Sequence, residues 1–430
     1  MDNSIYQESN DHLKRAEKSI PLGSQTFSKS KTQYPVGISP LYIDKAKGSE
    51  VWDIDGNKYY DLVNSLGAVT LGYQNKKIDN QVKKQLKKGT IFSLPGVLEA
   101  EVAELIIETV PSAEMVRFSK NGSDATSAAI RLARAYTGKT EIAFCGYHGW
   151  ADWYIGATSM NKGVPDIVSA LTHKFEYNNI DSLQEIFNKC ENNIAAVILE
   201  PMNLAYPKND FLNSVKKLAK KYNSVLIFDE TITGYRFSEG GAQKEFAVIP
   251  DLTTLGKGIA NGYPLAAIVG RKELMKEMEN IFFSGTFGGE LLSLAAAKTV
   301  IQMHLDYEIT KDLAAIGENI ATNLNKLIVS NGMTSCLTLT GHPTWKFLNW
   351  SPTEKYSSSV LKTYFMQEMF KRGVLVLSTH NVSITITEKI ISKILSAYDE
   401  VLTNMSFNIK NDTILENLLV DPITPLFSVR

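Results

Sequence analysis

A single lysine lies in an otherwise uncharged, glycine-rich stretch, TTLGKGIANGYPLAA (253–267). Lys257 stands between Gly256 and Gly258, and no nearby residue in the stretch carries a charge that could pair with it. An amine among small apolar neighbours loses hydration, which lowers its pKa and leaves a neutral nucleophile able to form an imine. Most lysines are instead solvated surface groups, and this interpretation stays open for Lys257 on these residues alone.

Acidic residues end two apolar runs, AAVILEP (195–201) and SVLIFDE (224–230). Runs of this kind are typical of buried parallel strands, which deliver a carboxylate at their C-terminal ends. The intervening stretch 211–222 has its apolar residues on one face of a helix. The three segments therefore predict a βαβ unit within an α/β layered core.

The second run ends in two adjacent carboxylates, Asp229 and Glu230. Neighbouring side chains on a strand point to opposite faces, so only one of them can enter a cleft at the carboxyl edge of a sheet. A buried carboxylate also needs a cation. Structural pairing with Arg236 is the alternative to a functional role, above all for Glu230.

A turn before a strong helical pattern contains Gly122 and Ser123. Free backbone N–H groups and the positive end of a helix dipole make such a turn an anion site, and glycine lets a phosphate approach closely. Asn121 and Asp124 also resemble an N-cap pair, and simple capping is the commoner use of such a turn.

The stretch FCGYHGW (144–150) holds aromatic side chains between glycines. Tyr147, His148 and Trp150 could form a flat wall for an aromatic ligand, because stacking needs an exposed ring and a close backbone. An aromatic loop packed on the core is the alternative.

Together, a phosphate cradle, an aromatic plate, a strand-end carboxylate and a glycine-flanked lysine are the parts needed to hold pyridoxal 5'-phosphate (PLP). In this interpretation, Asp229 keeps the pyridine nitrogen protonated so that the ring accepts electrons. Lys257 forms the Schiff base with the aldehyde.

The composition indicates which kind of partner and which cellular compartment to expect. A charged fraction of 21% and a net charge of -1 argue against a surface for nucleic acid or anionic membrane, and favour a small-molecule partner. Three widely spaced cysteines suit reduced thiols in cytoplasm. The N-terminus has no apolar signal region and no run is long enough to span a membrane. The histidines show no metal-binding spacing, so no zinc site is expected.

The chain is longer than one hydrophobic core usually supports, so more than one domain is expected. Residues 47–62 predict a hairpin with its turn at Asp55-Gly56. After about residue 310 the pattern changes to long helices and scattered strands, including 372–378. We therefore predict an N-terminal segment (1–72), a large PLP-binding domain (73–310) and a C-terminal small domain (311–430).

Six motifs, in order between about residues 35 and 305, resemble the class III (ornithine-type) PLP-dependent aminotransferases, and most closely the glutamate-1-semialdehyde 2,1-aminomutase branch. They are DIDGNKYYDL, RFSKNGSDATSAAIRLARAYTGK, GYHGWADW, ILEP, LIFDETITGYRFSEGGAQKEFAVIPDLTTLGKGIANGYPLAAIVGR and GTFGGE. The resemblance implies fold type I, an α/β fold whose large domain has a mostly parallel seven-stranded sheet, with an N-terminal segment and a C-terminal α/β domain. It also implies a homodimer with two sites at the interface.

The resemblance further implies a set of cofactor-binding residues. They are Gly122 and Ser123 at the phosphate turn, Tyr147 stacked on the ring, Glu200 and Thr231 near the cofactor, Asp229 at the pyridine nitrogen, Lys257 as the Schiff base, and Thr286 reaching the neighbouring subunit's phosphate. Lys257 and Asp229 are the implied catalytic residues. The family usually reads Ser-Gly-Thr-Glu where this chain has NGSD, and often valine at Thr231. A hydroxyl and the backbone donors remain, so phosphate binding should survive.

The expected substrate residues depart further from the aminomutase pattern. Thr26 and Lys29 fall at its serine and arginine, and a lysine cannot reproduce the two-pronged arginine fork for a carboxylate. Glu290 near the pocket mouth should disfavour acidic substrates, and Trp150 is the fourth expected contact. We therefore expect an aminotransferase that uses an amino donor and a carbonyl acceptor, such as a sugar or a small hydroxylated aldehyde or ketone. The alternatives are the aminomutase itself and a catalytically silent PLP-binding protein.

Overall fold

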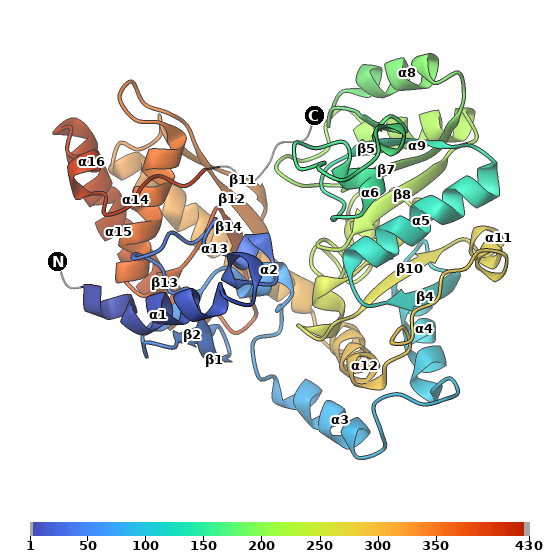
Figure 1. Cartoon of the computed structure of the whole chain (residues 1–430), viewed down its shortest axis with the longest axis horizontal. Helices are drawn as coiled ribbons and strands as arrows, with labels where there is room; N and C mark the ends of the chain where they lie inside the picture. The colour runs from blue at the N-terminus through green and yellow to red at the C-terminus, as the bar shows by residue number, and fades with distance from the viewer. Residues whose placement is uncertain (1–2, 425–430) are drawn as a thin grey trace. The chain divides into compact units, whose positions relative to one another are not determined.

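The computed structural model describes residues 3–424, which form two compact units (Figure 1). The large unit contains Gly67–Val69 and Lys76–Lys311, and the terminal unit contains the other described residues. The predicted N-terminal segment and C-terminal domain thus contribute most of their described residues to one unit. The three-part division at residues 72 and 310 stays a prediction.

The large unit is built on a seven-stranded sheet, as expected for fold type I. Its strand order is β4-β10-β9-β8-β7-β5-β6. Every strand is parallel to the others except β10, which runs antiparallel to both β4 and β9. The strands are β4 (Met115–Ser119), β5 (Glu141–Cys145), β6 (Thr172–Lys174), β7 (Ile194–Leu199), β8 (Val225–Glu230), β9 (Leu252–Leu255) and β10 (Ala266–Gly270).

Helices cover both faces of this sheet, which explains why its central strands are almost wholly apolar. Every residue of β7 and β8 is buried. One apolar cluster joins the sheet to α5 (Gly122–Thr137), and a second joins the other face to α8 (Ile180–Lys189) and α9 (Phe211–Lys221) (Figure 1). Strands buried on two faces lose the usual alternation of polar and apolar residues. The predicted βαβ unit is therefore confirmed as β7, α9 and β8.

The remaining helices of the large unit are α3 (Lys76–Leu86), α4 (Val97–Thr109), α6 (Asp152–Ile155), α7 (Asp166–Ser169), α10 (Ala242–Glu245), α11 (Lys272–Met275) and α12 (Leu291–Asp306), with the 3-10 helices η4 (Lys257–Ala260) and η5 (Lys276–Glu279).

The carboxyl ends of five parallel strands meet at one edge of the sheet. Leu199 at the end of β7 pairs with Cys145 of β5 and Phe228 of β8, while Glu230 of β8 pairs with Leu255 of β9. The residues that directly follow β4, β5, β7, β8 and β9 therefore share this edge, which is where open α/β sheets bind their ligands.

The terminal unit holds two smaller sheets, ordered β1-β2-β3-β13 and β11-β12-β14. The predicted hairpin is confirmed, since β2 and β3 pair antiparallel across the turn. The run 372–378 forms a strand of only two residues, β13, which is shorter than the apolar run suggested. The strands are β1 (Ile43–Lys47), β2 (Glu50–Asp53), β3 (Lys58–Asp61), β11 (Leu337–His342), β12 (Trp345–Trp350), β13 (Val374–Leu375) and β14 (Thr379–Asn381).

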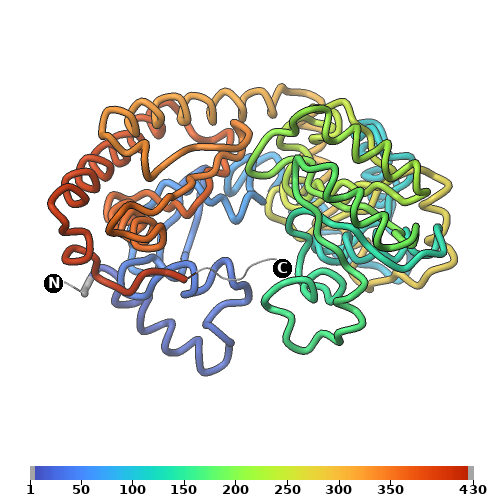
Figure 2. The backbone as a smooth tube through the Cα atoms, turned by 90° about the horizontal axis from the view of Figure 1, so that it is seen from above, coloured from blue at the N-terminus to red at the C-terminus, as the bar shows by residue number. Residues whose placement is uncertain are grey.

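Long helices complete the terminal unit, and α14 packs against α15 in the orange and red part of the trace (Figure 2). Within residues 3–424, no helix combines the length and apolar character needed to cross a membrane. The helices are η1 (Asn3–Tyr6), α1 (Gln7–Ala16), η2 (Pro21–Gly23), η3 (Phe27–Lys29), α14 (Ser358–Lys371), α15 (Glu388–Lys410) and α16 (Ile414–Asn417), while α2 (Asn64–Gly67) and α13 (Ile309–Ser330) cross the unit boundary.

Candidate active site

Lys257 follows β9 after one residue, Gly256, and opens the short helix η4. Its backbone has a φ of 44°, in the left-handed region that few non-glycine residues adopt. A strained backbone of this kind persists only where the surrounding structure holds the residue in place, and such residues cluster at active sites. Burial lowers the pKa of Lys257 to about 8, against the opposing charges of Glu200 and Asp229. At physiological pH a larger fraction of this amine is therefore neutral than for a solvated lysine, which is the direction that the sequence predicted.

Thr231 lies between the turn that carries Lys257 and the start of α5. A Cβ placed on Gly256 would lie 3.0 Å from Thr231 Cγ2, and one placed on Gly122 would lie 3.1 Å from the same atom. Both backbones therefore approach the side chain more closely than a residue with a Cβ would comfortably allow. The structure brings together the ends of β4, β8 and β9, as the resemblance implied.

Asp229 is buried at the end of β8, with 5% of its surface exposed. Its Oδ1 accepts hydrogen bonds from Thr231 Oγ1 at 2.6 Å and Thr254 Oγ1 at 2.9 Å, while Oδ2 lies 2.9 Å from His148 Nδ1. Burial alone would raise the pKa of Asp229, but the hydrogen bonds and charge of His148, with the hydrogen bonds from Thr231, lower it below its ordinary value. The carboxyl is thus held ionised.

His148 is a site residue whose role the sequence did not reveal, although its aromatic stretch was noted. Its Nε2 lies 3.1 Å from the carbonyl oxygen of Cys145, which only accepts hydrogen bonds. This geometry places Nε2 to donate to the carbonyl of Cys145, while Nδ1 faces the carboxylate of Asp229. The ring thereby fixes the orientation of the carboxylate and balances part of its charge.

Glu230 points away from Asp229, as adjacent strand residues must. Its carboxylate accepts hydrogen bonds from Thr233 Oγ1 at 2.8 Å, from Gln243 at 3.0 Å and from the backbone N–H of Ala242. Hydroxyl, amide and backbone donors therefore hold this carboxylate, and its pairing with Arg236 stays a prediction. Glu230 has a structural position, and Asp229 has the position at the site.

The loop after β5 carries an exposed aromatic ring beside a buried carboxylate. Tyr147 is 52% exposed, and its backbone N–H donates to Glu200 Oε2 at 3.0 Å. Asn203 Nδ2 donates to the same oxygen at 2.8 Å. Burial raises the pKa of Glu200. Trp150 is 69% exposed, so both rings present open faces rather than packing in the core.

The N-terminus of α5 supports both interpretations of its turn. Asn121 Oδ1 accepts from the N–H of Asp124 at 3.1 Å, and Asp124 Oδ2 accepts from the N–H of Asn121 at 3.1 Å, so the predicted capping pair is confirmed. The N–H groups of Gly122 and Ser123 lie in the first turn, where a helix offers no internal acceptor. The cap therefore leaves two donors directed at the place where an anion would bind.

Gly149 allows the aromatic loop to approach this helix start. Ser123 Oγ accepts from the N–H of Trp150 at 3.1 Å, and a Cβ on Gly149 would lie only 2.0 Å from Ser123 Oγ and 2.9 Å from Ser123 Cβ. Rotating the serine would not remove the second overlap. The space beside the helix start is therefore one that only glycine leaves open.

Replacing Gly149 by alanine is expected to loosen this loop. Both Gly149 and Gly163 have a φ near 100°, at 102° and 91°, so alanine at either adds left-handed strain of about 1–2 kcal/mol. Only Gly149→Ala also creates an overlap, worth a further loss of about 1–3 kcal/mol, since a Cβ on Gly163 meets nothing within 4 Å. Denaturant unfolding and PLP titration of both variants should show the larger losses in Gly149→Ala. Equal losses would contradict the close approach.

Glu290 and Thr286 lie at and before the start of α12. Glu290 is the N-cap of this helix, and its carboxylate accepts from the N–H groups of Leu292 and Ser293. Lys120 Nζ lies 3.2 Å from Glu290 Oε2. Although burial opposes it, these hydrogen bonds lower the pKa of Glu290. The Glu290 carboxylate thus already has hydrogen-bond donors and a lysine beside it. It should therefore repel an acidic substrate less than the sequence suggested. Thr286 is exposed.

Thr26 and Lys29 belong to the terminal unit and are both exposed. Lys29 Nζ lies 3.4 Å from Ser65 Oγ, and the charge of Lys29 acts on the buried Asp61. Lys29 also lines a cavity of about 510 Å³ whose walls are mostly apolar and aromatic, Tyr34 among them. The positive charge therefore already has a carboxylate neighbour within its own unit.

Residues 33–405 match the aminotransferase class-III family. The chain belongs to this family. It is accordingly a PLP-dependent aminotransferase, with small-molecule substrates.

Two curated relatives of this class-III aminotransferase have different activities. The 3-aminobutyryl-CoA aminotransferase of Cloacimonas acidaminovorans (strain Evry) is 34% identical over 377 residues, which cover 86% of this chain and 90% of that protein. The glutamate-1-semialdehyde 2,1-aminomutase of Persephonella marina (strain DSM 14350 / EX-H1) is 38% identical over 324 residues, which cover 71% and 76%. Among solved structures, the PLP internal aldimine form of the FumI protein of Sphingopyxis sp. MTA144 is similar, with a TM-score of 0.87, 25% identity and coverage of 96% and 98%.

The geometry of this aminotransferase fits the cofactor of its family. Its carboxyl edge offers an amine of lowered pKa, an ionised buried carboxylate, an exposed aromatic ring and a helix start with unpaired N–H groups, the groups that an aldehyde, a pyridinium, a flat ring and a phosphate each require. The close approaches at Gly122 and Gly149 leave room beside that helix start.

Proposed function

We propose that these residues hold PLP in the roles that the resemblance implied. Lys257 would bind the aldehyde carbon, Asp229 would accept a hydrogen bond from the protonated pyridine nitrogen, and Tyr147 would cover the ring. Gly122 and Ser123 bind the phosphate through backbone N–H groups. When bound, PLP supplies the electron sink that stabilises a carbanion at the substrate carbon. The observation that supports the assignment is the convergence of Lys257 and Asp229 at one sheet edge.

The remaining cofactor contacts act on orientation. Glu200 would fix the loop through its hydrogen bond with the N–H of Tyr147, and Thr231 would lie beneath the ring between Gly122 and Gly256. His148 would keep Asp229 ionised. When not bonded to the cofactor, Lys257 Nζ would take a proton from the substrate carbon as general base and return it, as general acid, to the carbon of the cofactor's former aldehyde group.

The pH dependence of PLP capture should report the lowered pKa of Lys257. Only a neutral amine attacks an aldehyde, so the rate of capture by cofactor-free protein is expected to rise with pH and to level off above about 8. Between about 8 and the ordinary value of 10.5, the unfolded chain binds more protons at this lysine than the folded chain. Stability of the cofactor-free protein should therefore rise with pH in that window.

Stopped-flow absorbance across the alkaline range measures the rate of PLP capture. The substitution Lys257→Met should abolish the rise in stability of the cofactor-free protein between about pH 8 and 10.5. A capture rate that keeps rising to pH 10.5, as for a solvated lysine, would contradict the lowered pKa.

For the substrate, we infer intermolecular transfer between an amino donor and a carbonyl compound other than glutamate 1-semialdehyde. A sugar or a small hydroxylated aldehyde or ketone fits the sequence departures best. The observation that carries this proposal is Lys29, which stands where the aminomutase has an arginine and whose charge already acts on Asp61. A single ammonium so placed is a poor carboxylate receptor. The 3-aminobutyryl-CoA aminotransferase relative shows that curated relatives of similar identity include an intermolecular aminotransferase.

An assay with glutamate 1-semialdehyde tests the proposal directly. Purified holoenzyme is expected to form little or no 5-aminolevulinate, while a panel of amino donors should include one that bleaches the absorbance of the lysine-bound cofactor. Rapid formation of 5-aminolevulinate would establish the aminomutase alternative instead. No spectral change with any donor would favour a silent PLP-binding protein.

We further propose that the chain works as a homodimer in the cytoplasm. Thr286 is exposed in the single chain, in keeping with a contact to the phosphate of a neighbouring subunit. The three cysteines are unpaired, in keeping with a reducing compartment. Light scattering of the holoenzyme would test the dimer, and a monomeric active enzyme would exclude the shared site.

A further inference from the structure

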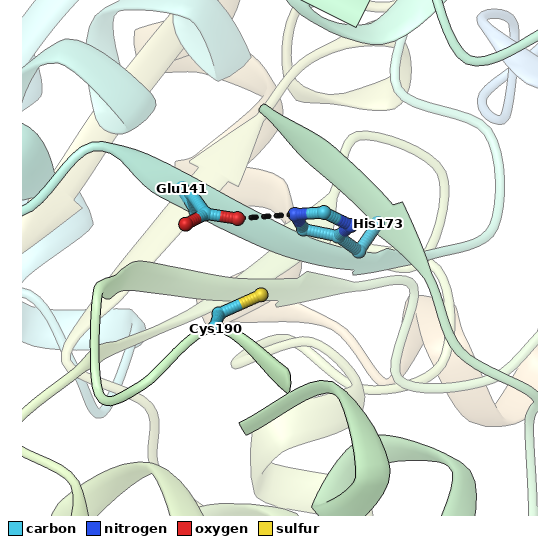
Figure 3. A group of neighbouring side chains, drawn as sticks. All are labelled: Glu141, His173 and Cys190. Carbon is cyan, nitrogen blue, oxygen red and sulfur yellow. Dashed lines mark hydrogen bonds and ion pairs between the residues drawn. The ribbon is translucent and has the colours of Figure 1, made fainter. Parts of the chain in front are cut away.

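Three potential metal ligands converge at the other end of β5 from the PLP site. Glu141, His173 and Cys190 each offer one ligand atom, and these atoms all lie within 4.8 Å of one another (Figure 3). His173 Nε2 lies 2.5 Å from Glu141 Oε2, the contact drawn as a dashed line in Figure 3. A carboxylate, an imidazole and a thiol thus share one small volume.

The sheet register explains why residues far apart in sequence meet here. Ala143 of β5 pairs with His173 of β6, and Glu141 lies two residues before Ala143, so both side chains point to the same face. That face is covered by α8, and Cys190 is the C-cap residue of this helix. These long separations also explain why spacing rules for histidine and cysteine indicated no metal site.

The local surroundings hold the carboxylate and leave the group accessible. Asn193 Nδ2 donates to Glu141 Oε1 at 3.2 Å, and the N–H of Asn193 donates to the carbonyl of Cys190 at 2.7 Å. Side chains of Glu141 and His173 are 19% and 17% exposed, whereas Cys190 is 5% exposed. Because β6 is the edge strand of the sheet, an ion could reach the group from solvent.

The ligand set selects a class of metal ion. One sulfur, one nitrogen and one oxygen suit a borderline-soft ion such as Zn²⁺, whereas Mg²⁺ and Ca²⁺ require oxygen ligands. Zinc bonds of about 2.0–2.3 Å to these atoms place tetrahedral ligands roughly 3–4 Å apart. The ion would replace the proton between Glu141 and His173 and the proton of the Cys190 thiol, and the short contact between Glu141 and His173 would open by about an ångström.

We propose that Glu141, His173 and Cys190 form a zinc site with a solvent molecule as fourth ligand. The ion would act on stability, because it would tie the start of β5, the edge strand β6 and the end of α8. It lies at the amino edge of the sheet, while Lys257 and Asp229 lie at the carboxyl edge. Zinc binding here should therefore change stability without changing turnover.

The test measures zinc in untagged holoenzyme by equilibrium dialysis with elemental analysis. One ion per chain is expected, and zinc-edge X-ray absorption should show one sulfur at about 2.3 Å. Cys190→Ala and His173→Gln should weaken binding by more than about 100-fold, since loss of even an outer-sphere partner costs about 10- to 100-fold. Cys336→Ala, which removes a buried unpaired thiol in the terminal unit, is the matched control and should bind normally.

Thermal unfolding gives a second readout that does not depend on catalysis. Zinc should raise the midpoint of the wild type and of Cys336→Ala, but not that of Cys190→Ala. Substoichiometric zinc, an absorption spectrum with no sulfur, or equal binding by Cys190→Ala would each overturn the proposal. The three side chains would then be a polar cluster without a metal.

Discussion

Replacing Lys257 by alanine is expected to reduce turnover by more than about 10⁴-fold, because one side chain supplies both the covalent attachment and the proton transfer. PLP should still bind through the phosphate turn and Asp229, but without the absorbance of a lysine-bound aldehyde. Borohydride reduction followed by peptide mapping should label the wild-type peptide at Lys257 and leave the variant unlabelled.

Lys139→Ala is the matched control for this substitution. Burial also lowers the pKa of Lys139, but the residue lies just before β5, at the amino edge of the sheet. Its removal should leave turnover close to the wild-type value. An adduct on any other lysine, or substantial activity in Lys257→Ala, would contradict the assignment.

Asp229→Asn is expected to reduce turnover by about 10²- to 10³-fold, the usual loss when one preorganised charge or donor is removed from an active site. The amide has the same shape, so the contacts with Thr231 and Thr254 can largely persist and the fold should be retained. It carries no charge, however, and cannot keep a pyridine nitrogen protonated. Turnover assays measure the loss of activity, the amount of bound PLP measures cofactor binding, and circular dichroism measures whether the fold is retained.

Asp251→Asn provides the comparison for Asp229→Asn. Asp251 accepts a hydrogen bond from the N–H of Leu226 at 2.8 Å and lies just before β9, far from the carboxyl ends. Its replacement should cost stability but not turnover per folded molecule. If the two variants lost activity equally, Asp229 would have only a structural role.

His148→Gln should have a smaller effect than Asp229→Asn, because glutamine can still donate one hydrogen bond but carries no charge. The burial of Asp229 would then raise its pKa. The loss of turnover should therefore increase as the pH falls, which a purely structural histidine would not cause.

The central architecture could be predicted because it depends on local patterns. The apolar runs of β7 and β8 and the amphipathic face of α9 each identify their element within a few residues. The strand predicted over 372–378 was too long, because a buried apolar residue need not pair with a neighbouring strand. Val376 is fully buried, yet only Val374 and Leu375 pair with β3.

The residues of the candidate site could be predicted where their neighbours in the sequence indicate their chemistry. Glycines flank Lys257, and Asp229 ends an apolar run, so both could be named. The partners of Asp229 could not, because His148 and Thr254 reach it only through the alignment of separate strands. The contact between Glu290 and Lys120 could not be predicted for the same reason, because the two residues meet only in the folded structure.

Strand β10 runs against its neighbours, so the chain leaves β9 and enters β10 at the same edge. A parallel partner would require a crossover of about a dozen residues or more, usually with a helix, whereas here the short segment between Leu255 and Ala266 is sufficient. The nucleophile is thus tethered at both ends by adjacent strands. Lengthening this tether, even by a few inert residues, should uncouple the amine from its carboxylate while leaving the sheet intact.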